Sequence, residues 1–252
     1  MSQPVRYILI CPARTGSSAL VSYLQSHPNI CSHPEVFGVH TVEFYGVMGR
    51  LKPPIIDWLT ELRRRDPIRF LNEFVFYAGK RKAVGFKFKF EELSLSQFEE
   101  ATDYLRRDTD IKIIFLTRKN LLKRYVSQYL AVHVNKKYNF HKGEALPPTE
   151  RIRLEASECA SDFVFTSRRQ ATYRAFFSEH PLLEVTYEDL VDAHDETLTR
   201  IQDFLGVEPL ALETKLVKIQ QQPLSAVIEN FEELRAYFVD TDYAVFFDDT
   251  VR

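Results

Sequence analysis

A turn of small residues with one arginine stands near the start of the chain and reads Pro12-Ala-Arg-Thr-Gly-Ser-Ser18. Gly16 lets the backbone bend and approach a ligand closely. Arg14 adds a charge that cannot be titrated away, and Thr15, Ser17 and Ser18 add hydroxyl donors. A helix beginning at Ser17 would point its free N–H groups at the same place. The turn predicts an anion-binding cradle, although a plain strand–turn–helix whose serines only cap the helix accounts for the same residues.

The turn lacks the features of the common nucleotide motifs. A Walker A loop requires a lysine directly after its last glycine and another glycine five residues earlier, and Gly16 has neither. No Gly-x-Gly-x-x-Gly run for a dinucleotide follows a predicted strand. A metal-assisted NTPase is therefore disfavoured.

A second arginine stands at the end of another predicted strand. The mostly apolar run 111–117 is followed directly by Arg118, and then by a helical pattern with Asn120 as its cap and Ser127 within it. Ligands of open α/β sheets bind beyond the carboxyl ends of the strands. Arg14 and Arg118 at two strand ends predict two anionic groups held apart on one ligand.

Two lysines share one face of a third predicted strand. The segment 83–90 alternates, with Val84 and three phenylalanines on one face and Lys87 and Lys89 on the other. The two lysines either face water or, if that face looks into the cleft, neutralise an anionic substrate. Of the two, Lys87 is favoured as a functional residue.

A stiff, proline-containing segment after the first helix carries His33 and Glu35. Glu35 precedes two apolar residues, so a partly desolvated carboxylate suited to general-base work is one interpretation. A surface glutamate in a loop is the other. Several histidines and glutamates lie nearby, but none has the four-residue helical spacing of a His-x-x-x-His metal site, and we expect no metal.

The remaining pattern predicts an α/β protein with a central parallel sheet covered by helices. The chain has 252 residues, 45% of them hydrophobic, and a net charge of −2, which argues against nucleic-acid binding. We expect one domain over 1–252, with 41–82 and 134–160 as insertions or lids on the acceptor side. The predicted elements are strands at 7–11, 83–90, 111–117 and 182–187 and helices from Ser17 and at 94–107, 163–180, about 195–205 and 225–237.

The location is predicted from segments that the sequence lacks. No apolar stretch approaches about 20 residues, and the N-terminus shows no signal-peptide pattern. Three widely spaced cysteines are expected to be reduced thiols. A cytoplasmic protein without a membrane span is expected.

Three motifs in order resemble those of sulfotransferases that use 3′-phosphoadenosine-5′-phosphosulfate, in particular bacterial carbohydrate sulfotransferases. The segment 12–18 resembles the 5′-phosphosulfate loop, and 113–118 through Ser127 resembles the 3′-phosphate motif. Val185-Thr-Tyr-Glu-Asp-Leu190 resembles the segment near the adenine, and the stretch from Lys218 to Ser225 is similar to the C-terminal nucleotide-binding loop. The resemblance spans about 10–235 and matches poorly at 41–82 and 134–160.

The resemblance implies a P-loop-like fold and metal-independent, in-line transfer of a sulfuryl group to a hydroxyl acceptor, with adenosine-3′,5′-bisphosphate as the product. It implies Glu35 as general base with His33 in reserve, and charge stabilisation by Arg14 and Lys87. The implied donor-binding residues are Arg14, Thr15, Gly16, Ser17, Ser18, Arg118, Ser127, Tyr187 and Lys218. The acceptor implied at family level is a carbohydrate or glycolipid, while a tyrosine or lipid hydroxyl and the oligomeric state stay open.

The sequence differs from the family pattern at two points, and two other functions stay open. Cytosolic members carry a lysine where Arg14 stands, and the nine-residue gap from Arg118 to Ser127 is one longer than theirs. A nucleotide-dependent kinase and a non-catalytic module for a nucleotide or sulfated ligand are the alternatives. A magnesium requirement would favour the kinase, and donor binding without turnover would favour the module.

Overall fold

A five-stranded sheet forms the centre of the computed structural model, which describes residues 3–40, 42–46, 49–148, 150–217 and 222–248. Its strands, in the spatial order β2-β5-β1-β6-β7, are β2 (Ile30–His33), β5 (Ala83–Lys89), β1 (Val5–Cys11), β6 (Lys112–Thr117) and β7 (Leu182–Thr186). Every neighbouring pair is parallel. The apolar run of β1 is buried because the strand lies in mid-sheet with both faces covered. The predicted parallel α/β sheet is confirmed.

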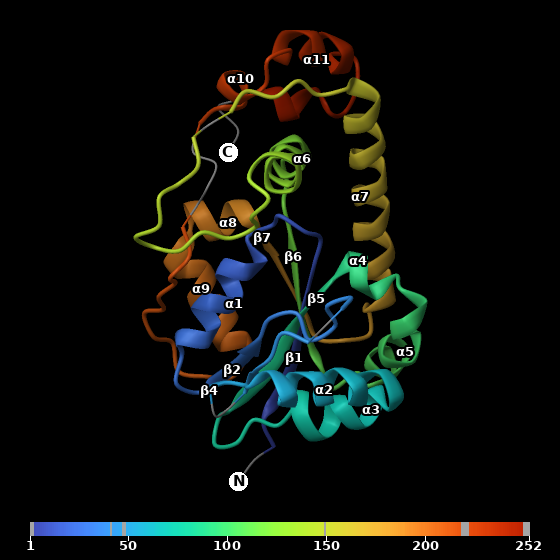
Figure 1. Ribbon diagram of the computed structural model, residues 1–252, viewed down its shortest axis with the longest axis vertical. Coiled ribbons are helices and arrows are strands. Elements are labelled where there is room, and N and C mark those ends of the chain that lie inside the picture. The colour runs from blue at the N-terminus through green and yellow to red at the C-terminus, as the bar shows by residue number, and fades with distance from the viewer. Residues whose placement is uncertain (1–2, 41, 47–48, 149, 218–221, 249–252) are drawn as a thin grey trace.

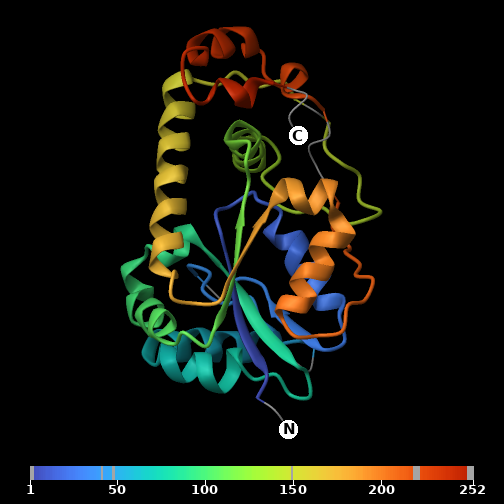
Figure 2. The same cartoon turned by 180° about the vertical axis from the view of Figure 1, so that it is seen from behind.

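Helices cover both faces of the sheet and make a three-layer arrangement (Figures 1 and 2). On one face, side chains of α1 (Ser17–Ser26) and α9 (His194–Phe204) pack into an aliphatic core, and α8 (Tyr187–Asp192) leads into α9. On the other face, α2 (Pro53–Arg65), α3 (Pro67–Phe70), η1 (Leu71–Val75) and α5 (Glu99–Arg107) bury a core rich in phenylalanine.

A third cluster of buried residues lies beyond the carboxyl end of the sheet, at the top of Figure 1. It joins α6 (Leu121–Tyr129), α7 (Ala156–Phe176), α10 (Leu224–Val227), α11 (Phe231–Phe238) and η4 (Ala244–Phe247). Asn120 caps α6 as predicted, since its side chain accepts a hydrogen bond from Lys123 N at 2.9 Å. The short elements are β3 (Tyr45–Gly46), β4 (Gly49–Arg50), α4 (Phe90–Leu93), η2 (Ser96–Phe98) and η3 (Leu130–Val134).

Three helix predictions need correction. The helix expected over 94–107 begins at Glu99, because Ser94 ends α4 and its hydroxyl donates to Glu91 O at 3.1 Å rather than capping a new helix. The helix expected at 163–180 covers 156–176, and the one at 225–237 is split into α10 and α11. The strand expected over 83–90 ends at Lys89, since Phe90 starts α4.

The two segments predicted as insertions differ in structure. Leu59, Phe70 and Leu71, from the segment 41–82, are almost fully buried in the core of the sheet. In the segment 134–160, the described residues between η3 and α7 have few regular elements, and the last five residues form the first turn of α7. None of the helices in the described part of the chain combines the length and apolarity that crossing a membrane requires.

Candidate active site

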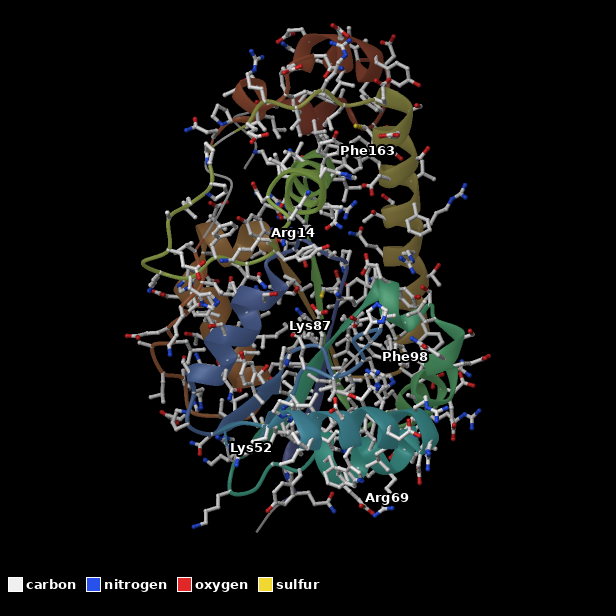
Figure 3. The ribbon with its side chains drawn as sticks, in the orientation of Figure 1. Arg14, Lys52, Arg69, Lys87, Phe98 and Phe163 are labelled. Carbon is white, nitrogen blue, oxygen red and sulfur yellow. The ribbon has the colours of Figure 1, made fainter. Side chains whose placement is uncertain are left out.

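A cavity of about 1220 Å³ opens beyond the carboxyl ends of β1 and β5, roofed by α6 and α7. Figure 3 places Lys87 on the sheet near the centre of the molecule and Arg14 above it, toward α6. Both predicted insertions contribute to the wall, 41–82 through Glu43 and Tyr45, and 134–160 through Tyr138 and its neighbours. The cavity therefore joins the predicted donor loop to segments that the sequence could not place.

The loop after β1 turns sharply because Arg14 and Gly16 both have left-handed backbones, with φ of 68° and 79°. Arg14 Nε donates to Ser127 Oγ at 3.0 Å, and its Nη1 donates to Tyr138 O at 2.9 Å. Thr15 is fully buried and donates its hydroxyl to Pro12 O at 3.0 Å, so this side chain holds the turn. The first motif and the serine of the second are thus in direct contact.

Arg118 lies on the other side of the same loop. Its guanidinium sits 4.3 Å from the ring centroid of Tyr187 and donates to Arg14 O at 3.3 Å. The side chain is buried, and its Nε has no hydrogen-bond partner among the residues that the structure describes. Tyr187 in turn covers Gly16, where an added Cβ would stand 2.9 Å from its ring. Arg14, Arg118, Ser127 and Tyr187 come from three motifs and meet at one place.

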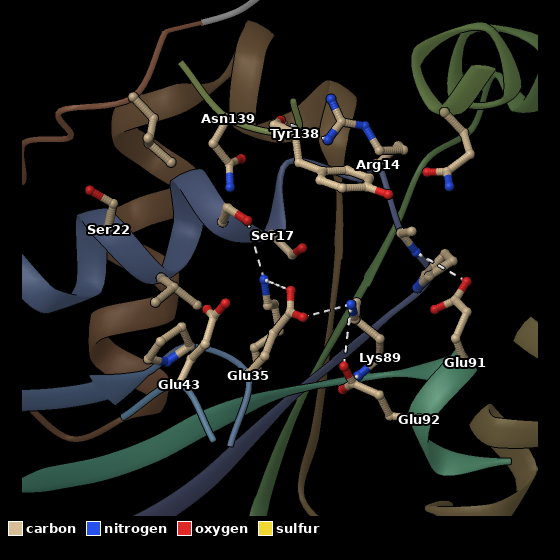
Figure 4. A pocket seen from close by; sticks show the side chains of 18 of the residues that line it. Arg14, Ser17, Ser22, Glu35, Glu43, Lys89, Glu91, Glu92, Tyr138 and Asn139 are labelled. Atoms are coloured by element: carbon tan, nitrogen blue, oxygen red, sulfur yellow. Dashed lines mark hydrogen bonds and ion pairs between the residues drawn. The ribbon is translucent and has the colours of Figure 1, made fainter. Parts of the chain in front are cut away.

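A chain of alternating charges runs along the floor of the cavity (Figure 4). Lys87 Nζ donates to Ser18 Oγ at 3.2 Å and contacts Glu35 Oε1 at 2.8 Å. Lys89 Nζ contacts Glu35 Oε2 at 2.7 Å and Glu92 Oε1 at 3.2 Å. Lys87 and Lys89 reach the cavity because they share one face of β5, opposite the phenylalanines.

Burial and neighbouring positive charges have opposite effects on the pKa values of Glu35 and Glu92. Burial alone would raise the pKa of Glu35, but the ion pairs with Lys87 and Lys89 outweigh it and hold the pKa at about 2. At Glu92 burial prevails over Lys89 and raises the pKa to about 7. Glu35 is therefore held as a carboxylate by the two lysines, in a half-buried place rather than on an open surface loop.

Only part of the predicted site lines the cavity. Its lining includes Arg14, Ser17, Ser18, Glu35 and Lys87, whereas Thr15, Gly16, Arg118, Ser127 and Tyr187 belong to or contact the loop of Arg14 without lining the cavity. His33 lies apart from both. The His33 ring is buried, stacks on Phe44 at 4.2 Å between centroids, and has Nε2 3.1 Å from Val75 O. Burial lowers its pKa to about 4, so it is neutral at pH 7. Lys218 falls outside the described residues. In the described ranges, no three His, Cys, Asp or Glu side chains gather where they could hold a metal ion.

Sequence reasoning missed part of the site. Glu92 lines the cavity although its position after Phe90-Glu91 resembles the polar start of a surface helix. The only local signal is Lys89, three residues earlier, which marks a short capped turn. Arg124 and Asp162, an ion pair on α6 and α7, also line the wall, and nothing in either local sequence indicates a cavity.

The parallel sheet, the basic loop at its carboxyl edge and the three motifs that meet there agree with the resemblance to sulfotransferases. The chain is 26% identical to Nodulation protein H of Rhizobium tropici over 254 residues, which is 98% of this chain and 95% of that protein. It is 24% identical to Nodulation protein H of Rhizobium meliloti strain 1021, over 97% and 96% of the two chains. No protein-family model matches the sequence.

Two solved structures are similar at lower identity. A sulfotransferase from Alicyclobacillus acidocaldarius aligns with a TM-score of 0.49 and 17% identity, over 95% of this chain and 92% of that one. A mouse sulfotransferase, SULT7A1, complexed with PAP, aligns with a TM-score of 0.39 and 14% identity, over 97% and 75%.

Proposed function

We propose that the protein transfers the sulfuryl group of 3′-phosphoadenosine-5′-phosphosulfate to a hydroxyl of a carbohydrate acceptor, without a metal ion and with Glu35 as general base. The observation that carries the proposal is one cavity lined by Arg14, which Arg118 and Ser127 contact, and by the alternating lysines and glutamates Lys87, Glu35, Lys89 and Glu92. The arginine has the positive charge that an anionic donor requires, and the glutamate Glu35 can accept the proton of the acceptor hydroxyl.

Arg118 and Ser127, which both contact Arg14, fit the 3′-phosphate of the donor. Arg118 is buried with an unpartnered Nε among the described residues, an arrangement that costs free energy unless an anion completes it. Tyr187, which packs against Gly16 and the Arg118 guanidinium, joins the donor loop to Arg118 and would lie near the adenine. These residues would hold the 3′-phosphate and the adenosine.

The loop from Ser17 to Ser18 and Lys87 would face the phosphosulfate. When bound, the donor supplies a sulfuryl group on a phosphate leaving group, so the S–O bond to the phosphate breaks as the acceptor oxygen bonds to sulfur. Lys87 already contacts Ser18 of the loop, so its ammonium is placed to neutralise charge that develops on the leaving oxygen. Arg14 adds a second fixed charge at the same loop.

Glu35 would take the acceptor proton. Its low pKa keeps it ionised throughout the working pH range but makes it a weak base while both lysines hold it. Lys87 lies between Glu35 and the loop, so an anionic group on the loop competes with Glu35 for the same ammonium. Loosening that ion pair raises the basicity of Glu35 when the donor is in place.

The outer wall of the cavity supports a hydroxyl-rich acceptor. Arg124 is buried, its Nε lacks a hydrogen-bond partner among the described residues, and it pairs with Asp162. Phe165 is 59% exposed, with the Arg169 guanidinium 4.7 Å from its ring centroid. Polar hydroxyls satisfy such donors and acceptors, whereas a purely apolar acceptor would leave them desolvated and unpaired.

Transfer of ³⁵S from labelled donor tests the proposal. The assay contains EDTA and a panel of mono- and oligosaccharides, a phenol and a fatty alcohol. Glu35→Gln should lower transfer about 100-fold or more while retaining binding of adenosine-3′,5′-bisphosphate. Glu99→Gln, an exposed charge loss on α5, should leave transfer unchanged. Full transfer by Glu35→Gln would remove Glu35 from the role. No ³⁵S transfer, together with ³²P transfer from γ-labelled ATP in a parallel assay with magnesium and without EDTA, would show a kinase.

A further inference from the structure

Glu92 is a buried acid that the proposed mechanism does not use. Its side chain is 3% exposed, yet it lines the cavity at the end of the charge chain, as Figure 4 shows. One oxygen, Oε2, accepts the backbone N–H of Lys89 at 3.0 Å and caps α4. The other, Oε1, lies 3.2 Å from Lys89 Nζ. An uncharged polar oxygen would cap α4 equally well, so capping does not explain why a titratable acid occupies this buried position.

Lys89 is shared between two acids. Its ammonium lies 2.7 Å from Glu35 Oε2 and 3.2 Å from Glu92 Oε1. When Glu92 is ionised, the ammonium divides its attraction between the two carboxylates, and Glu35 also feels a second negative charge nearby. When Glu92 is neutral, Lys89 serves Glu35 alone. In the second state Glu35 holds its charge more firmly and accepts a proton less readily.

We infer that Glu92 is a positioning residue for Glu35, and that its charge, acting through Lys89, sets how readily Glu35 accepts a proton. The inference rests on the proposed role of Glu35 as base. The groups that act on Glu92 are Lys89 of β5, Glu35 of the loop after β2, Arg63 of α2 and Cys11 of β1. Burial raises the pKa of Cys11 to about 12, so this thiol keeps its proton at neutral pH.

The charge of Glu92 changes in the neutral range, because burial raises its pKa to about 7. Acidification through this range neutralises Glu92, and the Lys89 ammonium then forms an ion pair with Glu35 alone. Transfer should therefore decline below about pH 7 even though Glu35 itself stays ionised down to far lower pH. A fall in the transfer rate below about pH 7 would therefore follow the ionisation of Glu92 and not that of Glu35, the proposed base.

A carbon-13 titration of labelled glutamate carboxyls tests the inference on the free protein, without an acceptor. The Glu35 and Glu92 resonances are assigned from Glu35→Gln and Glu92→Gln, with exposed Glu99 as the control resonance. In the wild-type protein, Glu35 should show a chemical-shift step at the pH where Glu92 titrates, and Glu99 should show none there. In Glu92→Gln, whose amide oxygen can still cap α4, the step at Glu35 should vanish.

A Glu35 resonance that is flat from pH 6 to 8 in the wild-type protein would overturn the inference, as would a step that persists in Glu92→Gln. If Glu92→Gln does not fold, coincident midpoints in the wild-type protein still support the coupling, and a flat Glu35 resonance still refutes it. Failure of Glu35 as the base would appear in the ³⁵S assay and leave this titration unchanged, so the two failures are distinguishable.

Discussion

Replacing Glu35 by glutamine should destabilise the fold in a pH-dependent way. Glu35 has a pKa of about 2 in the folded protein, against 4.5 for an ordinary glutamate side chain. A lowered folded-state pKa stabilises the protein above the unfolded value and ceases to do so as pH falls towards the folded value. The shift corresponds to about 3 kcal/mol at neutral pH, and the 24% exposure of the side chain reduces this to about 2 kcal/mol.

Urea unfolding of the wild type and Glu35→Gln between pH 3 and pH 7 measures this difference. The free energies of unfolding should differ most above about pH 5 and converge as pH falls towards 3. Glu61→Gln is the matched control, because Glu61 also lies between two cations, Arg64 and Arg65, but on the surface. Glu61→Gln should change the free energy of unfolding much less than Glu35→Gln does. Equal effects of the two substitutions, or a Glu35 effect that does not shrink with acidification, would refute the reasoning.

Two further substitutions test the donor site. Gly16→Ala should weaken binding of adenosine-3′,5′-bisphosphate about tenfold or more, measured by calorimetry, because φ is 79° and the new Cβ meets Tyr187 at 2.9 Å. Gly143→Ala has a similar φ of 89° but open space around it, so it should leave binding unchanged, and equal losses would contradict the Tyr187 contact. Lys87→Met should lower ³⁵S transfer about 100-fold while changing bisphosphate affinity far less; parallel losses would show that Lys87 acts only in binding.

The sequence predicted the elements whose local pattern and tertiary environment agree. The apolar run of β1, the alternation of β5 and the Asn120 cap each specify their element without help from distant residues. The start of α7 was missed because its first turns carry few apolar residues and only Cys159 is buried among them. Its helical state depends on packing against α6, which the local sequence does not encode.

The properties of the site also fall into those that the local sequence predicts and those that depend on distant residues. Arg14 and Lys87 were predictable as cavity residues, and Arg118 as their neighbour, because each stands in or after a strand whose end faces the ligand edge of a parallel sheet. The low pKa of Glu35 was not predictable, because it depends on Lys87 and Lys89, more than fifty residues away in the sequence.

A thermal-shift titration with adenosine-3′,5′-bisphosphate, beside ATP with magnesium, tests the central claim most directly. At a ligand concentration of 100 times Kd, binding adds about 2.7 kcal/mol of stability, which raises the Tm of a chain of this size by roughly 5–10 °C. The bisphosphate alone should stabilise the protein, and Arg118→Ala should lose most of that shift. Stabilisation only by ATP with magnesium, or a full bisphosphate shift in Arg118→Ala, would contradict the donor site described here.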